Sequence, residues 1–268
     1  MLIAAAQMNS QADKAANLEA ATRLVRRAAE LGASFIGLPE NFAWMGPEPE
    51  RAAAAETLEG YSLGRMAQLA RELKVTLLAG SILESGAPEG KLFNTSVLFG
   101  PDGMALATYR KIHLFDVDVG DGVSYRESDA VAPGHEVVCA DAPFGKVGLS
   151  VCYDLRFPEL YRKLSRKGAQ VLCVPAAFTL MTGKDHWEVL LRARAIENQA
   201  YVLAPAQHGR HGEKRLTYGH AMVIDPWGLV TARASEGEGL ALAQLDADLL
   251  ERVRKSLPAL SHRRLQGA

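Results

Sequence analysis

The sequence repeats a pattern of predicted elements, and this repeat limits the folds open to the chain more than any other feature does. Residues 32–39 are Gly-Ala-Ser-Phe-Ile-Gly-Leu-Pro, and residues 168–175 are Gly-Ala-Gln-Val-Leu-Cys-Val-Pro. In each case a glycine ends a helical pattern, an apolar run predicts a buried strand, and a proline ends that strand. The flanking segments follow the same order of strand, helix, strand, helix, strand, turn and strand. We therefore expect two similar α/β halves.

The predicted strands are rich in Val, Ile, Leu and Ala on both faces, so each sheet needs cover on both sides. Two such sheets packed face to face, with their helices outside, form a four-layer α-β-β-α sandwich. We expect a single domain over residues 1–268, with a C-terminal tail from about residue 258. One doubly wound sheet of the Rossmann kind is the alternative, but no Gly-x-Gly-x-x-Gly motif follows a predicted strand. The predicted strands are 2–8, 33–38, 75–83, 92–99, 104–111, 146–151, 170–174, 201–206, 218–224, 229–234 and 240–245, and the predicted helices are 17–31, 62–73, 158–166, 185–200 and 247–257.

Composition and charge exclude several classes of protein. The chain is 48% hydrophobic and 23% charged, so it can bury a large core. Its 30 basic and 31 acidic residues give a net charge of −1, which argues against nucleic acid or an anionic membrane as a partner. No apolar run approaches the roughly 18 residues that span a bilayer, and the N-terminus lacks a charged leader. Three cysteines without CxxC spacing favour neither a disulfide framework nor a zinc site, so a cytoplasmic protein is expected.

Residues 147–160 place a cysteine between a strand and a helix. The apolar run 147–151 predicts a buried strand, and Pro158 with the acid beside it predicts a helix N-terminus. Cys152 lies in the turn between them, where the positive end of a helix dipole favours a thiolate over a thiol. The alternative is that Cys152 is one more small buried hydrophobic residue.

Two further candidate residues follow predicted strands. Glu40 comes directly after the strand 33–38, and Lys111 ends the strand 104–111. If the two sheets pair about a pseudo-twofold axis, these strand ends and Cys152 can share one rim. A carboxylate can then take the thiol proton, and an ammonium and the backbone N–H of Tyr153 can stabilise an oxyanion. The set suits acyl transfer from an amide or nitrile carbon, although either charged residue alone could be a solvated surface group.

Three segments together resemble the signature segments of the nitrilase (carbon–nitrogen hydrolase) superfamily. They are Leu-Pro-Glu at 38–40, Tyr-Arg-Lys at 109–111 and Val-Cys-Tyr-Asp-Leu-Arg-Phe-Pro-Glu at 151–159. The resemblance runs from residue 3 to about residue 264. The three motifs together are specific for the superfamily, although none of them is specific alone. It implies an amidase that takes a small-molecule amide, uses neither a metal nor a cofactor, and pairs across helices as a homodimer.

The resemblance also assigns roles to individual residues. Carried over by position, Glu40 is the general base, Lys111 stabilises the oxyanion and Cys152 is the nucleophile. The family has a second active-site glutamate between the lysine and the cysteine, and Glu127, in Tyr-Arg-Glu-Ser, matches its position. It is expected to hydrogen-bond the lysine and to help orient the amide. A loop acid without a catalytic role is the alternative for Glu127.

Within the superfamily, residues 111–116 resemble amidases that act on α-keto acid amides, the omega-amidases and the deaminated glutathione amidases. Residues 186–197 and 209–220 are more similar to the second group, which implies hydrolysis of deaminated glutathione to 2-oxoglutarate and Cys-Gly. The Gly120-Asp-Gly122 loop is a departure from the pattern.

Deaminated glutathione carries a carboxylate at each end, and arginine binds carboxylates through its bidentate fork. Arg156, four residues after the nucleophile, is the candidate for the α-keto carboxylate. Arg210 and Arg215, together with Lys214 in a basic loop over residues 208–215, are candidates for the glycine carboxylate. The alternatives are a structural ion pair for Arg156 and a solvated loop for the other two.

Other functions stay open on the sequence alone. The chain could be an omega-amidase that acts on α-ketoglutaramate, or a hydrolase of carbamoyl amino acids or nitriles. From another class, it could be a non-catalytic interaction module or a thiol redox sensor. The complete set of Glu40, Lys111, Glu127 and Cys152 argues against a loss of catalysis, and no resolving cysteine lies close in sequence to Cys152.

Overall fold

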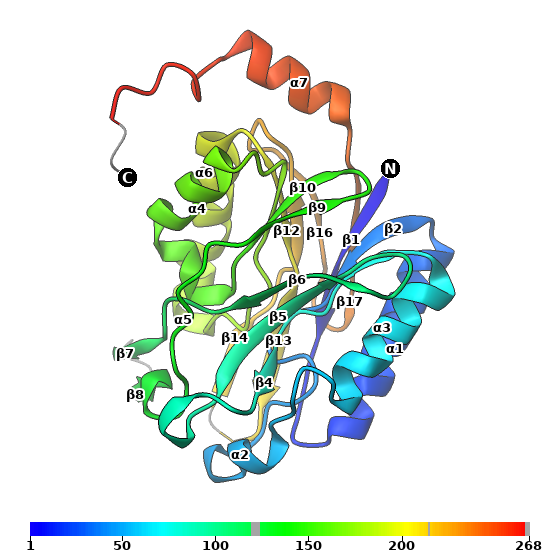
Figure 1. The fold of residues 1–268 in the computed structure, drawn as a ribbon, viewed down its shortest axis with the longest axis vertical. Helices are drawn as coiled ribbons and strands as arrows, with labels where there is room; N and C mark the ends of the chain where they lie inside the picture. The colour runs from blue at the N-terminus through cyan, green and yellow to red at the C-terminus, as the bar shows by residue number, and fades with distance from the viewer. Residues whose placement is uncertain (119–123, 214, 266–268) are drawn as a thin grey trace.

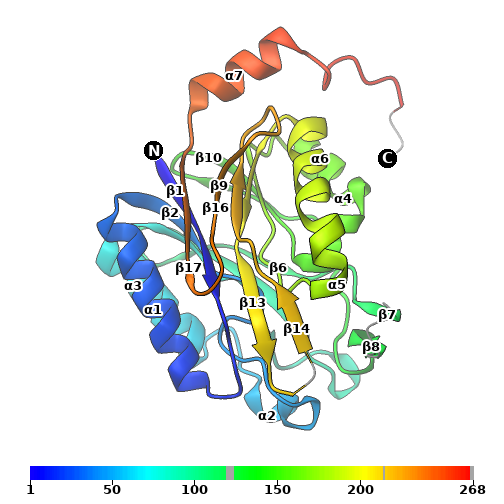
Figure 2. The same ribbon diagram turned by 180° about the vertical axis from the view of Figure 1, so that it is seen from behind.

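Two β-sheets pack face to face, and helices cover the outer face of each sheet in the computed structural model of the chain (Figure 1). The structure describes residues 1–118, 124–213 and 215–265. Helices lie outside the first sheet and outside the second, as the opposite view also shows (Figure 2). The predicted four-layer α-β-β-α sandwich is therefore confirmed. The outer helices are α1 (Lys14–Glu30), α3 (Tyr61–Leu73), α4 (Pro158–Arg166) and α6 (Glu188–Asn198).

The two sheets share one arrangement, as the sequence repeat predicted. Within the described residues, each sheet contains three neighbouring parallel strands followed by two antiparallel ones. In the first sheet these are β1 (Leu2–Met8), β2 (Ala33–Gly37), β3 (Thr76–Leu78), β5 (Phe93–Phe99) and β6 (Ala105–Arg110). In the second sheet they are β10 (Gly145–Leu149), β11 (Val171–Cys173), β12 (Tyr201–Ala204), β15 (Met222–Ile224) and β16 (Val230–Arg233). The repeated runs supply the corresponding strands β2 and β11.

Strand β1 shows why the strands are apolar on both faces. Ile3 and Ala5 belong to the core between the sheets, which they share with Val147 of the second sheet. Ala4 and Ala6 belong to the separate core beneath α1 and α3. Since successive side chains of a strand point to opposite faces, a strand between two packed layers is expected to be apolar on both faces.

The last strands of the chain return to the first sheet. Strand β17 (Gly239–Gln244) pairs antiparallel with β1, and β13 (Ala206–His211) pairs parallel with it. Strand β13 also forms a hairpin with β14 (Arg215–Tyr218). The expectation of a loop over residues 208–215 is therefore wrong. This polar, glycine-containing stretch lacks an alternating pattern, and its extended conformation is stabilised by pairing with a strand far away in sequence.

Gly80 divides the strand that was predicted over residues 75–83. The chain forms β3, turns, and continues as β4 (Ile82–Glu84). Gly80 has a φ of 37°, and a Cβ atom there would lie 1.9 Å from the carbonyl oxygen of Pro39. Only glycine fits this approach of two backbones. The contact fixes the segment that carries Glu40.

The predicted helix over residues 185–200 begins earlier than expected. A short helix α5 (Leu180–Thr182) leads through the π-helical turn Gly183–Trp187 directly into α6. Asp185 and Glu188 have the spacing of a capping box but do not form one, because Asp185 lies inside the helical turn instead of preceding it.

The remaining elements lie at the edges of the sandwich. Helix α7 ends close to residue 258, where the C-terminal tail was expected to begin. Across the described ranges, none of the helices is long and apolar enough to cross a membrane. These elements are α2 (Arg51–Ala54), β7 (Asp116–Asp118), β8 (Ser124–Arg126), β9 (Cys139–Ala142) and α7 (Ala247–Ser256).

Candidate active site

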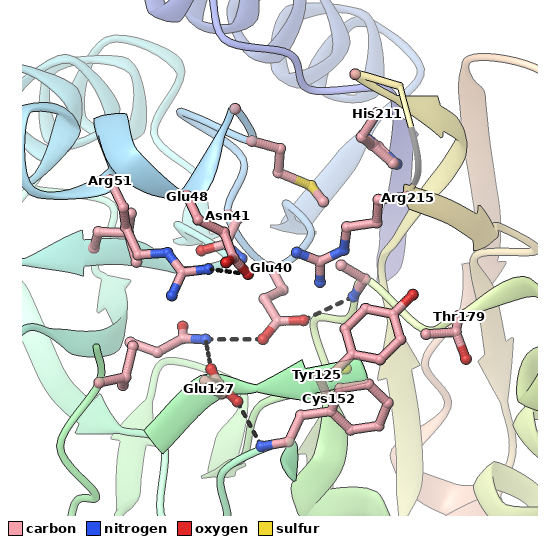
Figure 3. Close-up of a pocket in the computed structure, with 18 of the residues that line it drawn as sticks. Glu40, Asn41, Glu48, Arg51, Tyr125, Glu127, Cys152, Thr179, His211 and Arg215 are labelled. Atoms are coloured by element: carbon pink, nitrogen blue, oxygen red, sulfur yellow. Dashed lines mark hydrogen bonds and ion pairs between the residues drawn. The ribbon is translucent and has the colours of Figure 1, made fainter. Parts of the chain in front are cut away.

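The ends of strands from both sheets meet around a cavity of about 590 Å³ (Figure 3). Glu40 follows β2, Lys111 follows β6 and Cys152 follows β10. All three side chains line this cavity, together with Glu127. The structure thus places the three predicted strand ends on one rim.

The Glu40 carboxylate is almost fully buried, with 2% of the residue exposed. Its Oε1 accepts hydrogen bonds from Lys111 Nζ at 3.0 Å and Asn94 Nδ2 at 2.8 Å, and its Oε2 accepts one from the Ala177 N–H at 2.9 Å. Burial acts to raise the pKa of Glu40, but the charges of Lys111 and Arg215 and the hydrogen bonds from Cys152 and Lys111 lower the pKa below its ordinary value. Glu40 is therefore a carboxylate at neutral pH.

Lys111 lies between two carboxylates. Its Nζ is 3.0 Å from Glu40 and 2.8 Å from Glu127 Oε2, and 2% of its side chain is exposed. Burial acts to lower the pKa of Lys111, but the charges of Glu127 and Glu40 raise it above its ordinary value. The Phe115 N–H donates to Glu127 Oε2 at 2.7 Å and holds this carboxylate in place. The contact between Lys111 and Glu127 that the sequence predicted is present.

Asn94 of β5 was not predicted as a site residue. Its Nδ2 donates to Glu40 at 2.8 Å and to Glu127 at 3.2 Å, so one amide connects the two carboxylates. The sequence signal was weak, since Asn94 is one of three consecutive polar residues in β5, and a buried polar residue is expected to need a partner.

Cys152 lies in a strained turn. It has a φ of 49°, and its N–H donates to the Pro175 carbonyl at 2.9 Å. Burial and the charge of Glu40 raise the pKa of the Cys152 thiol well above its ordinary value, and the charge of Lys111 only partly offsets them. The expectation that a helix dipole favours a thiolate is therefore wrong, because α4 begins only at Pro158 and a carboxylate lies beside the sulfur. The resting side chain is a thiol that donates to Glu40.

Three arginines were predicted to bind substrate, Arg156, Arg210 and Arg215. Of these, Arg215 lines the cavity within the described residues. Its buried Nε has no hydrogen-bond partner among them. Arg51, at the start of α2, lines the opposite side, as Figure 3 shows. It pairs with Glu48 at 3.5 Å and was missed, since an arginine in an alanine-rich segment carries no distinctive pattern.

Arg156 and Arg210 lie outside the set of residues that line the cavity. Arg156 contacts His186 Nδ1 at 3.3 Å, and its guanidinium lies over the Phe178 ring, 5.1 Å from the centroid. Arg210 is exposed and donates to the Glu213 carbonyl at 2.7 Å. Arg156 nevertheless lies beside the cavity, because the rings of Tyr153 and Phe178 beneath its guanidinium both line it.

Within the described residues, the site offers neither a free histidine nor a cluster of metal ligands. His211 lines the cavity, but burial lowers its pKa to about 4, and its ring is held by Ser10 and Thr217 at 2.7 Å each. Across residues 1–118, 124–213 and 215–265, no cluster of histidine, cysteine and carboxylate side chains could hold a metal ion. The loop Gly120-Asp-Gly122 and Lys214 lie outside the described residues.

A family model for carbon-nitrogen hydrolases matches residues 2–255 of this chain. The chain belongs to the carbon-nitrogen hydrolase family. The resemblance expected from the sequence is thus confirmed, and an enzyme that hydrolyses amides is supported by the names of its relatives.

Two relatives and one solved structure illustrate the similarity of this carbon-nitrogen hydrolase to known proteins. Deaminated glutathione amidase of Synechocystis sp. strain PCC 6803 is 51% identical over 265 residues, which cover 98% of this chain and 97% of that protein. Omega-amidase NIT2 of Xenopus tropicalis is 39% identical over 251 residues, which cover 94% of this chain and 90% of that protein. The crystal structure of Saccharomyces cerevisiae Nit3, a member of branch 10 of the nitrilase superfamily, matches this structure with a TM-score of 0.89. The two sequences are 33% identical, and the match covers 99% of this chain and 97% of that chain.

Proposed function

We propose that this hydrolase cleaves the amide bond of deaminated glutathione to 2-oxoglutarate and Cys-Gly, through a catalytic triad of Glu40, Lys111 and Cys152. The observation that carries the proposal is the buried contact of a carboxylate, an ammonium and a protonated thiol in the wall of one cavity. The choice of substrate is supported by the name of the Synechocystis relative, at 51% identity over almost the whole chain.

The first half of the proposed reaction forms a thioester. Glu40 takes the proton of the Cys152 thiol as the sulfur attacks the amide carbon. The Lys111 ammonium and the backbone N–H of Tyr153 donate hydrogen bonds to the oxyanion that develops. Glu40 then returns its proton to the leaving amine as the carbon–nitrogen bond breaks, and Cys-Gly departs.

The second half of the proposed reaction consumes water. Glu40 now takes a proton from a water molecule, which attacks the thioester carbon and releases 2-oxoglutarate. The sulfur leaves as a thiolate and recovers its proton from Glu40. The carboxylate of Glu127, 2.8 Å from Lys111, keeps the ammonium charged and in place through both steps.

Two arginines of the cavity match the two carboxylates of the proposed substrate. The positive charge of Arg215 acts on Glu40, so Arg215 is close to the reacting centre and is our candidate for the α-keto carboxylate. Arg51 lies across the cavity and is the candidate for the more distant glycine carboxylate. A cavity of about 590 Å³ falls in the usual range for small-molecule sites.

Hydrolysis of both α-keto acid amides by the purified protein tests this assignment. We expect a higher kcat/KM for deaminated glutathione than for α-ketoglutaramate, with 2-oxoglutarate measured as the common product. The reverse preference would identify an omega-amidase, the second candidate, which the 39% identical relative supports. Turnover of neither compound would reject both, and carbamoyl amino acids and nitriles would be tested next.

We also propose that the protein is a cytoplasmic homodimer with one domain per chain. The resemblance to the family and the two free hydrophobic side chains on the outer face of α6 support the dimer, since Val189 is 65% exposed and Ile196 is 49% exposed. Light scattering after gel filtration measures the mass directly. A mass of 28.9 kDa for the particle in solution would reject the dimer.

A further inference from the structure

The carboxylate of Asp154, two residues after the nucleophile, is fully buried and accepts four hydrogen bonds. Oδ2 accepts from the Tyr109 hydroxyl at 2.7 Å and from the Val151 N–H at 2.8 Å. Oδ1 accepts from the N–H of His113 at 3.0 Å and from its ring Nδ1 at 2.7 Å. A carboxylate offers about four acceptor positions, so the capacity of Asp154 is filled.

The donors come from the two segments that carry the catalytic residues. Tyr109 and His113 lie two residues on either side of Lys111, at the end of a strand of the first sheet. Val151 and Asp154 flank Cys152 in the turn after β10 of the second sheet. One buried carboxylate therefore joins the backbone around the ammonium to the backbone around the thiol.

This connection acts on a turn that is strained at the nucleophile. Cys152 has a φ of 49°, a conformation that non-glycine residues keep only where surrounding contacts enforce it. The bond from the Val151 N–H fixes the residue before the sulfur, and the His113 ring that binds Asp154 also stacks on Phe157 at 3.7 Å. The turn is thus held on both sides of the cysteine.

We propose that Asp154 is a positioning residue that sets the location of Lys111 relative to Cys152. The inference rests on the proposed cysteine mechanism, but it does not depend on which amide is the substrate. A displacement of about 1 Å between reacting groups can cost on the order of 10²-fold in rate. Loss of the Asp154 contacts is therefore expected to lower kcat and to leave KM nearly unchanged, because Asp154 itself lies below the cavity wall.

Three variants test this role by steady-state kinetics, with kcat expressed per titrated active site so that unfolded molecules do not count. Asp154→Asn is expected to lower kcat by roughly 10- to 100-fold with KM within about threefold of wild type. Tyr109→Phe removes one of the four bonds and keeps the charge, so about a threefold loss of kcat is expected. Asp225→Asn is the matched control, because Asp225 is also a buried aspartate that accepts two backbone N–H bonds, at the turn after β15. We expect its kcat to stay within about twofold.

A second readout needs no substrate and separates this inference from the proposed function. Alkylation of Cys152 by iodoacetamide, followed by intact-protein mass, depends on Glu40 and Lys111 being close to the sulfur. We expect slower alkylation in Asp154→Asn and in Tyr109→Phe than in wild type and Asp225→Asn. Equal alkylation rates in all four proteins, or a kcat within twofold of wild type in Asp154→Asn, would overturn the positioning role. An inactive wild type with slowed alkylation in the two variants would reject the proposed substrate and retain the positioning role.

Discussion

The two half-repeats bring the same kind of strand end to the catalytic cavity, but they contribute different chemical groups. In the first half, the proline-terminated strand is followed by Glu40, whose carboxylate faces the cavity. In the second half, the corresponding residue is Ala176, and the backbone is used instead. The Pro175 carbonyl accepts from the Cys152 N–H, and the Ala177 N–H donates to Glu40 Oε2 at 2.9 Å.

The difference shows how a repeated scaffold acquires one active site instead of two. The first half supplies Glu40, Lys111 and Glu127, and the second half supplies the thiol, the positive charge of Arg215 and the backbone dipoles. Because the two sets contact each other, the proposed catalytic arrangement forms where the two sheets meet. Replacing one group at a time tests this division of roles.

The largest effect is expected from the second half, at the nucleophile. Cys152→Ala removes the atom that forms the thioester, so turnover should fall on the order of 10⁴-fold or more while the fold is retained. Circular dichroism and product detection measure both properties. Cys139→Ala, at a half-buried cysteine outside the cavity, is the matched control and should keep most activity. A folded Cys152→Ala protein with a tenth of the wild-type rate would refute the nucleophile.

The next effect is expected from the first half, at the base. Glu40→Gln keeps the shape and can still contact Lys111, but it cannot take the thiol proton, so a loss of about 10²- to 10⁴-fold in kcat is expected. Mass spectrometry of the quenched reaction should show no acyl adduct on Cys152, because the resting side chain is a thiol. Accumulation of the adduct would assign Glu40 to the hydrolytic step alone.

An intermediate effect is expected at the arginines. Loss of a charge-assisted hydrogen bond costs roughly 1.5–3 kcal/mol, or about 10- to 150-fold. Arg215→Met should lower kcat/KM by this factor for both α-keto acid amides, whereas Arg51→Met should affect only deaminated glutathione. Arg210→Met, outside the cavity, is the control. An equal loss of kcat/KM on both substrates in Arg51→Met would show that Arg51 does not bind the glycine carboxylate.

The smallest effect is expected from pH. The pKa of Glu40 lies below its ordinary value of 4.5, so the base is charged above that pH and activity is lost only as pH falls through the lowered pKa. The pKa of Cys152 lies well above 9.0, so the thiol stays protonated below that pH. Hence kcat/KM should vary less than about twofold between about pH 6 and 8. A tenfold rise per pH unit across this interval would indicate a thiolate nucleophile formed by titration and not by Glu40.

The sandwich was predictable because the patterns that indicate its strands lie within short stretches of the sequence. Each repeated run is mostly apolar and ends in proline, which predicts buried strands without any knowledge of their partners. The candidate catalytic residues Glu40, Lys111 and Cys152 were identified in the same way, because they follow such strands. Asn94 was not found, since only the pairing of its strand brings its amide to the two glutamates.

The differences between the sequence expectations and the structure share a cause, which is contact between segments distant in sequence. Arg156 is close to Cys152 in the chain, yet its side chain is taken up by Phe178 and His186. The hairpin of β13 and β14 has no strand pattern of its own and is extended because it pairs with β1. Gly80 carried a partial signal, since an isolated glycine within a strand pattern suggests a close backbone approach.

The position of β1 between its neighbours has a consequence for synthesis of the protein. Strand β1 is made first, but β13 and β17, which pair with it, are among the last strands to leave the ribosome. Until then, a nearly wholly apolar strand has an open edge that can pair with other chains. A nascent chain of this protein therefore needs protection by chaperones through most of its translation, and a premature stop before residue 239 is expected to yield aggregates instead of a folded amino-terminal half.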